Sequence, residues 1–211
     1  MIKEIIFTLV MCVIIFILFW KFWFLRNPNR HIPEGKSIIS PADGKVIEII
    51  KFDKNNLLNM KNEPLTINKG LLGKIKTTTA DVSDSGYIVS IFMSPFDVHY
   101  NRMPIDGEIL SVVHTSGKFL PVMTFEHGLL NEKNEILLSS YVGKIKVIQI
   151  AGFLARRISS FVNPKENIKK GQIIGLINLG SQLTIILPSN VKVNVTLNQK
   201  VKAGESVIAT Y

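Results

Sequence analysis

The chain has 211 residues, of which 46% are hydrophobic and 19% are charged. This composition excludes an intrinsically disordered protein and supplies enough material for a domain with its own core. A single cysteine excludes a disulfide framework and a cysteine-based zinc cluster, and the four histidines are too scattered for a recognisable metal-binding spacing. The net charge is +9, and such a basic surface suits an anionic partner, either nucleic acid or anionic lipid.

The first predicted element is a transmembrane helix over residues 5–25, which hold the excess of apolar residues. At about 1.5 Å per residue it just spans a hydrocarbon core of about 30 Å. A cleaved signal peptide is the alternative, but small residues do not follow the apolar run. More Lys and Arg follow the segment than precede it. This bias predicts a cell-membrane protein whose domain lies on the cytoplasmic side.

The predicted organisation is therefore an anchor at residues 1–26, a polar linker at residues 27–36 and a domain at residues 37–211.

Residues 37–211 are typical of a β protein. Residues 191–197 alternate strictly between apolar and polar, as expected of a half-buried strand. Apolar runs predict further strands at residues 86–93, 135–142, 144–150, 172–177 and 182–187. Turns with a glycine at the tip precede several strands, at Gly44, Gly107, Gly171 and Gly204. The predicted fold class is mainly β, a barrel-like or sandwich-like domain of short strands with one or two short helices.

Two stretches depart from this pattern. Apolar residues at helical spacing predict a short amphipathic helix over residues 151–161, with Arg156 and Arg157 on its polar face. Residues 55–79 are weakly patterned and rich in lysine, and we expect a loop there.

The sequence contains no P-loop, no GxGxxG, no HExxH and no GxSxG motif. Its basic residues are dispersed without interleaved aromatic residues, so no nucleic-acid partner is predicted. The polar residues instead gather in three clusters between strands, at residues 40–44 (SPADG), 92–104 (FMSPFDVHYNRMP) and 179–181 (LGS).

These clusters belong to an ordered set of motifs that covers nearly the whole chain. The set comprises residues 24–30 (FLRNPNR), 41–46 (PADGKV), 94–99 (SPFDVH), 117–120 (GKFL), 151–158 (AGFLARRI) and 180–181 (GS). In this order, and behind an N-terminal anchor, it resembles the phosphatidylserine decarboxylases in their short, membrane-anchored bacterial form. The resemblance implies a lyase that converts phosphatidylserine to phosphatidylethanolamine at an anionic membrane surface, and it suggests a homodimer.

The resemblance further implies a pyruvoyl cofactor derived from Ser181 by autocatalytic cleavage at Gly180-Ser181. The products would be a β chain of residues 1–180 and an α chain of residues 181–211. The pyruvoyl ketone would form a Schiff base with the substrate amine and accept electrons as CO₂ leaves. Gly180 suits the cleavage because glycine tolerates backbone distortion that a Cβ would forbid.

By the same resemblance, Asp43 and His99 belong to the catalytic site. Long-form relatives carry a second histidine three residues after the first as the processing base, but this chain has Arg102 there. Arginine cannot act as a base. Either His99 takes over as the processing base, or Asp43 acts as that base through a water molecule. Arg102 and His114 are candidate substrate-binding residues. For Arg102 the reason is that a guanidinium forms bidentate hydrogen bonds with a carboxylate or phosphate.

Each residue also has a simpler interpretation when taken alone. Gly180-Ser181 by itself is typical of a strand bulge, Asp43 of a turn before Gly44, and His99 of a partly buried histidine. A membrane-anchored, non-enzymatic adaptor with a lipoyl-like β domain is the alternative to an enzyme, because the glycine-turn-strand units resemble such domains.

Overall fold

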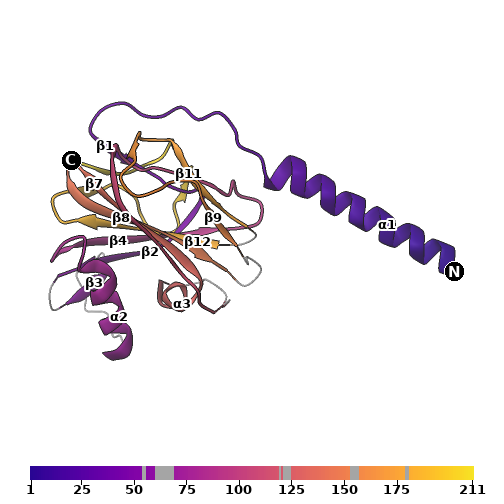
Figure 1. The fold of residues 1–211 in the computed structure, drawn as a ribbon, viewed down its shortest axis with the longest axis horizontal. Coiled ribbons are helices and arrows are strands. Elements are labelled where there is room, and N and C mark those ends of the chain that lie inside the picture. The colour runs from indigo at the N-terminus through magenta and orange to yellow at the C-terminus, as the bar shows by residue number, and fades with distance from the viewer. Residues whose placement is uncertain (54–55, 60–68, 119, 121–124, 153–156, 179–180) are drawn as a thin grey trace.

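The computed structural model describes the whole chain except residues 54–55, 60–68, 119, 121–124, 153–156 and 179–180. A domain built mainly from strands is preceded by one long apolar helix that projects away from it (Figure 1). The predicted fold class is confirmed.

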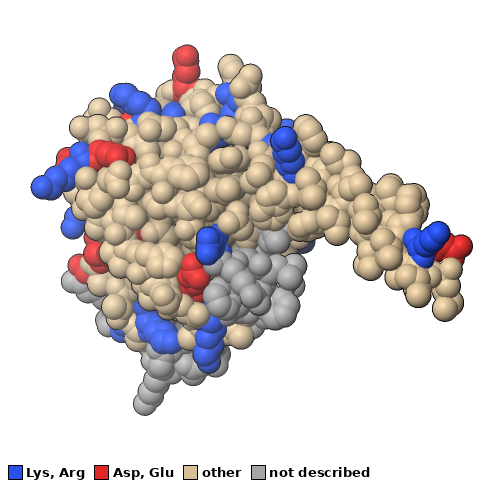
Figure 2. Space-filling model, turned by 45° about the vertical axis from the view of Figure 1, so that its right-hand side comes forward, with Lys and Arg blue, Asp and Glu red and all other residues tan. Residues whose placement is uncertain are grey.

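The projecting helix consists of α1 (Ile2–Leu18) and a π-helical continuation, η1 (Phe19–Phe24). Residues Ile2–Phe24 have a mean hydropathy of 2.7 over 18 residues, so this helix is long and apolar enough to cross a membrane. Figure 2 shows it as an uncharged rod between charged atoms at its far end and basic atoms near the domain. The helix begins three residues before the predicted segment of residues 5–25.

Fifteen strands and two further helices are assigned in the described part of the domain. The strands are β1 (Ser37–Ile39), β2 (Gly44–Phe52), β3 (Leu57–Asn59), β4 (Gly86–Met93), β5 (Tyr100–Arg102), β6 (Gly107–Thr115), β7 (Lys133–Ser140), β8 (Gly143–Ala151), β9 (Ile158–Ser160), β10 (Asn167–Ile168), β11 (Ile173–Ile177), β12 (Ser181–Pro188), β13 (Lys192–Val193), β14 (Lys200–Val201) and β15 (Val207–Thr210). The helices are α2 (Lys69–Thr79) and α3 (Phe125–Leu130).

The strands form one large sheet and two small ones. The large sheet has the order β10-β6-β7-β8-β12-β4-β2-β14, with β3 paired to β2. The small sheets have the orders β1-β15-β13 and β5-β11-β9. Every strand pair is antiparallel, as expected for short strands joined by tight turns.

β12 is the central strand of the large sheet, and all eight of its residues are buried. Leu183, Ile185 and Leu187 point into the main core, which the small sheets also line. Ile186 points the other way, into a second core under α2 and α3. Because side chains alternate between the faces of a strand, this arrangement buries β12 from both sides. The strand therefore offers a dry position at its first residue, Ser181.

The predicted glycine turns are present. Gly44, Gly171 and Gly204 have φ values of +148°, +84° and +82°. At Gly44 a Cβ would also lie 2.1 Å from the carbonyl oxygen of Phe92, so only glycine fits where β2 begins beside β4.

The predicted helix at residues 151–161 is wrong wherever the structure describes it. Ala151 ends β8, and Ile158 lies in β9 opposite Ile177 of β11. Residues 153–156 lie outside the described residues. Pairing with β11 overrides a spacing that is compatible with a helix but spans too few residues to decide between helix and strand.

Two other predictions need correction. Within residues 191–197, only Lys192–Val193 forms a strand, although Val191 and Val195 are buried as the alternation predicts. Within residues 55–79, β3 and α2 replace the expected loop, and residues 60–68 lie outside the described residues. The end of α2 is tied to the sheet by the buried Lys146, whose Nζ donates to the Thr78 carbonyl at 2.8 Å.

Two glycine substitutions test this packing. At Gly86 a Cβ would lie 2.0 Å from the carbonyl oxygen of Leu187, so Gly86→Ala must push β4 away from β12. We expect a loss of roughly 2 kcal/mol, seen as a thermal midpoint lower by about 5 °C for the full chain in detergent. Gly73→Ala is the control, because nothing lies within 4 Å of its Cβ position in α2, and it should stabilise the helix by roughly 0.5–1 kcal/mol. Equal midpoints for the two variants would contradict this account.

Candidate active site

The three polar clusters of the sequence meet at one end of the large sheet. The backbone N–H of Arg102 donates to the carbonyl of Pro41 at 2.9 Å, which joins the cluster at residues 40–44 to the one at residues 92–104. Ser181 lies opposite Met93 in the β12–β4 ladder, which joins the third cluster to the second. Segments that are far apart in the sequence thus form one candidate site.

Ser181 is the first residue of β12 and is fully buried. It lies between Met93 of β4 and Ala151 of β8, so its immediate neighbours in the sheet are apolar. Its hydroxyl donates to the Met93 sulfur at 3.3 Å, a weak acceptor. Gly180 lies outside the described residues. The hydroxyl is therefore held in a dry position without a strong hydrogen bond that must be broken before it reacts.

His99 is fully buried immediately before β5. Its Nδ1 lies 2.9 Å from the carbonyl oxygen of Asp97. Because a carbonyl can only accept, Nδ1 carries the proton in the neutral ring and Nε2 carries the lone pair. Nε2 is buried and has no hydrogen-bond partner among the residues that the structure describes. The ring therefore presents a bare proton acceptor inside the protein.

Burial lowers the pKa of His99 to about 4. The nearby Arg26 cation lowers this pKa further, whereas the hydrogen bond from Nδ1 and the charge of Asp97 partly oppose the shift. The imidazole is consequently neutral at physiological pH, with Nε2 ready to accept a proton.

The chain brings His99 and Ser181 to the same place by two routes. The N–H of Ile177, at the end of β11, donates to the carbonyl of His99 at 3.4 Å, and four residues later the chain reaches Ser181. Asn101 follows His99 by two residues, and both residues are fully buried. The Asn101 amide lies 3.7 Å from the Met93 sulfur that also accepts from Ser181. These contacts place the backbone of His99 beside the end of β11, and they place Asn101 and Ser181 at the same Met93 sulfur.

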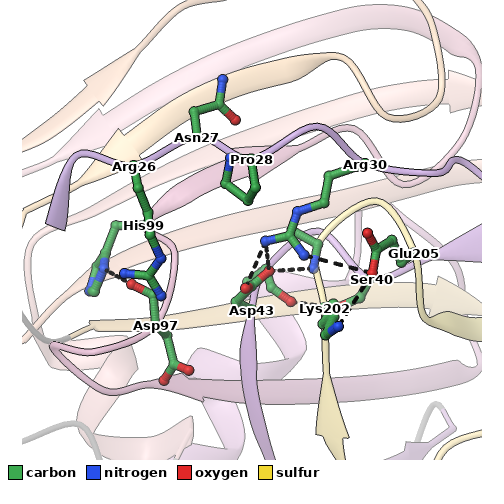
Figure 3. Close-up of polar contacts among 12 residues, drawn as sticks. Arg26, Asn27, Pro28, Arg30, Ser40, Asp43, Asp97, His99, Lys202 and Glu205 are labelled. Carbon is green, nitrogen blue, oxygen red and sulfur yellow. Dashed lines mark hydrogen bonds and ion pairs between the residues drawn. The ribbon is translucent and has the colours of Figure 1, made fainter. Parts of the chain in front are cut away.

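Asp43 occupies the turn between β1 and β2. Its two carboxylate oxygens accept from Arg30 Nη2 at 3.0 and 2.8 Å, and Oδ1 also accepts from the backbone N–H of Ala203 at 2.7 Å. The Arg30 and Asp43 side chains are only 6% and 13% exposed, so this ion pair is screened little by solvent. Arg30 comes from the predicted linker and reaches down to Asp43 (Figure 3).

Arg102 and His114, the two candidate substrate-binding residues, already have polar partners in this structure. The Arg102 guanidinium donates to the carbonyl of Gly171 at 2.9 Å and to the Asn27 side chain at 2.7 Å, so in this structure it fastens the linker to the domain. His114 is half exposed and lies 3.5 Å from Glu132. It belongs to β6, which β7 and β8 separate from the strand of Ser181.

A chain of buried amides also leads to the site, and the sequence analysis missed it. Asn134 donates to Gln149 at 2.9 Å, and Gln149 donates to Asn101 at 2.8 Å. It therefore runs from β7 through β8 to Asn101, beside the Met93 sulfur that accepts from Ser181. Asn101 stands in the same polar cluster as His99, which was the available signal. Asn134 in β7 and Gln149 in β8 gave no such signal, because the sequence of a single strand does not show what a buried amide contacts.

The arrangement is suited to acyl chemistry at a serine. A buried hydroxyl follows residue 180, and a neutral imidazole with a free Nε2 can take up a proton. Buried amide groups nearby can donate to an oxygen that gains charge.

Comparison with known proteins identifies the family. A sequence model of the family "Phosphatidylserine decarboxylase" matches residues 18–209. Phosphatidylserine decarboxylase proenzymes of Syntrophus aciditrophicus and Carboxydothermus hydrogenoformans are each 40% identical to this chain. The alignments cover 90% and 92% of this chain and 78% and 82% of those proteins. A relative from Methanocaldococcus jannaschii, also 40% identical over 92% of this chain and 90% of its own length, has a name that refers to archaetidylserine decarboxylase.

The molecule is thus a decarboxylase of the kind that is made as a proenzyme. The chain belongs to the phosphatidylserine decarboxylase family. The family predicted from the ordered motifs is confirmed, and the non-enzymatic adaptor is excluded.

The buried imidazole predicts a particular dependence of stability on pH. The pKa of His99 is about 4 in the folded chain and about 6.5 in an unfolded chain. Between these values the unfolded chain binds a proton that the folded chain does not, so stability is lost as the pH falls from about 6.5 to about 4, by roughly 3 kcal/mol in total.

His99→Gln should remove this part of the pH dependence. Thermal midpoints are compared between pH 4 and 7, with Ser181→Ala in both proteins so that neither can cleave itself at this serine. The same slope with and without His99 would show that the ring is not desolvated.

Proposed function

We propose that this protein decarboxylates phosphatidylserine to phosphatidylethanolamine with a pyruvoyl group that it makes by cleaving itself between Gly180 and Ser181. The observation that carries the proposal is the position of Ser181. In a chain that matches the family from residue 18 to residue 209, this serine is fully buried at the start of the central strand, close to the polar cluster that holds His99.

In the proposed cleavage, the Ser181 hydroxyl attacks the carbonyl carbon of Gly180 and loses its proton to a base. The C–N bond breaks, and the amide becomes an ester. Loss of the α-proton of residue 181 then breaks its Cβ–O bond, which frees the carboxylate of Gly180 and leaves dehydroalanine. This tautomerises to an imine, and water hydrolyses the imine to a ketone and ammonia. His99 Nε2 is the proton acceptor that the structure offers for this sequence.

The surroundings of residue 181 fit a pyruvoyl group. Met93 and Ala151 flank this position in the sheet, and an apolar wall suits a methyl ketone. Such a group supplies a carbonyl that binds the substrate amine covalently and accepts the electron pair released with CO₂. The protein's own side chains carry out the proton transfers. His99, neutral because burial lowers its pKa to about 4, accepts or returns a proton at Nε2.

The membrane placement is part of the proposal. In this proposal the helix Ile2–Phe24 spans the bilayer, and the excess of Lys and Arg at its C-terminal end supports a domain on the cytoplasmic side. A net charge of +9 attracts an anionic lipid more than a zwitterionic one. The homodimer that the resemblance suggests stays a prediction.

Ser181→Ala tests the cleavage, because alanine has no nucleophile. The wild-type protein should show two chains on a denaturing gel. By intact mass, its α chain should be lighter than residues 181–211 by one ammonia. The variant should be a single chain of 23.7 kDa without decarboxylase activity. Ser189→Ala, at an exposed serine just beyond β12, is the matched control and should behave as wild type. Two chains in Ser181→Ala, or one chain in active wild-type protein, would contradict the proposal.

His99→Ala tests the proton transfer, and we expect turnover of phosphatidylserine vesicles to fall at least roughly 100-fold. The exposed His31, changed to alanine, is the control. The gel separates the two possible roles: a cleaved but inactive variant assigns His99 to decarboxylation, and an uncut variant assigns it to processing. A fully cleaved variant that turns over at the wild-type rate would remove His99 from the site.

A further inference from the structure

We propose that Phe24, the last residue of the membrane helix, is a positioning residue for His99, so that the foot of the anchor forms one wall of the active site. The inference rests on the proposed function, because it assigns a role to Phe24 in the reaction that His99 serves. It goes beyond an anchor that only holds the domain near its substrate.

Phe24 is set apart by its burial. Within η1 it is the buried residue, and it is 0% exposed. Phe22 and Trp23, its neighbours in the same turn, are 68% and 49% exposed. A phenylalanine that only faced lipid would have no reason to enter the domain. Its burial therefore shows that the helix docks through this side chain.

The side chain that receives Phe24 is the imidazole. The two ring centroids lie 4.3 Å apart with an interplanar angle of 34°. Trp20 stacks on Phe24 in turn, with ring centroids 4.6 Å apart and an interplanar angle of 13°. His99 therefore has its Nδ1 fixed by the Asp97 carbonyl and one ring face covered by Phe24, which leaves little freedom to rotate.

The π-helical turn is consistent with this role. η1 covers the six residues Phe19–Phe24 that end the anchor. Such turns are wider than α-helical ones and are found frequently at functional sites. Here the turn includes both Phe24, which contacts the imidazole, and Trp20, which stacks on Phe24.

The same segment also holds the loop that carries His99. Arg26 Nη2 donates to the Phe96 carbonyl at 2.6 Å, and the Phe19 ring contacts the Phe96 ring edge-on at 6.2 Å. Figure 3 shows Arg26 reaching down beside Asp97 and His99. The charged groups that act on the imidazole are thus Arg26 from the end of the anchor and Asp97 from the loop, while β11 contributes the uncharged Ile177.

Uncovering the ring has a predictable effect on its protonation. Burial is the largest cause of the low pKa of His99, and Phe24 covers one face of the ring. Without that cover, water reaches the imidazole and its pKa rises toward the ordinary value of about 6.5. Because the neutral ring is the form that accepts a proton, the acid limb of the rate then moves to higher pH.

The test compares Phe24→Ala and Phe24→Leu with Phe24→Tyr in the full-length protein, with Phe22→Ala as the matched control in the same turn. The substrate is a soluble short-chain phosphatidylserine, so that delivery by the bilayer does not limit the rate. We expect kcat at neutral pH to fall roughly 10- to 100-fold in the alanine variant, with a smaller change in KM, and the acid limb of kcat to shift upward in both Ala and Leu variants. Phe24→Tyr should keep the wild-type kcat and the wild-type acid limb, and Phe22→Ala should match wild type.

The leucine variant guards against a folding defect, since it keeps an apolar side chain of similar bulk at this position. An NMR titration of the His99 ring gives its pKa independently of turnover. If wild-type protein is cleaved and depends on His99, but Phe24→Leu keeps both the wild-type kcat profile and the wild-type ring titration, this inference is overturned while the proposed function stands. If wild-type protein is uncut or His99→Ala is fully active, the proposed function itself fails.

Discussion

The exclusion of water from one imidazole is the constraint on which the site depends. His99 is fully buried, and only one of its two nitrogens has a partner among the described residues. A buried, unpaired acceptor costs free energy, but a buried imidazolium without a counter-ion would cost far more. The fold therefore selects the neutral ring, and the Asp97 carbonyl selects the tautomer. What results is a buried ring nitrogen that can accept a proton, in the polar cluster whose Met93 lies opposite Ser181.

The position after His99 where long-form relatives are expected to carry a second histidine serves another purpose here. Arg102 donates to Asn27 and to the Gly171 carbonyl, and Asp43 is held by Arg30. An arginine cannot exchange protons near neutral pH. Both oxygens of Asp43 already accept hydrogen bonds from donors outside the His99 loop. The two residues thus fasten the linker to the domain in this structure, and His99 is the candidate whose ring nitrogen has no partner among the described residues.

The sequence predicted the parts of the fold that depend on local pattern. Residues 86–93 form β4 as predicted, and residues 182–187 lie within β12, because apolar runs bounded by turns identify buried strands. The helix expected at residues 151–161 was wrong, since Ile158 pairs with Ile177, a contact that no local pattern encodes. The linker was predicted only as a spacer. The contacts of Phe24 with His99, of Asn27 with Arg102 and of Arg30 with Asp43 join residues that are between 13 and 75 positions apart, beyond the reach of periodicity.

A docked anchor does more for a membrane enzyme than a flexible tether. A tether raises the local concentration of the domain at the bilayer but leaves its orientation free. Here Phe24, Asn27 and Arg30 contact His99, Arg102 and Asp43 in turn, so the segment after the helix has little freedom left. In the proposed membrane orientation, these contacts would hold the site at a fixed distance from the end of the hydrophobic helix. The proposed lipid substrate would then present its headgroup near the end of the helix, and productive encounters would require no reorientation of the domain.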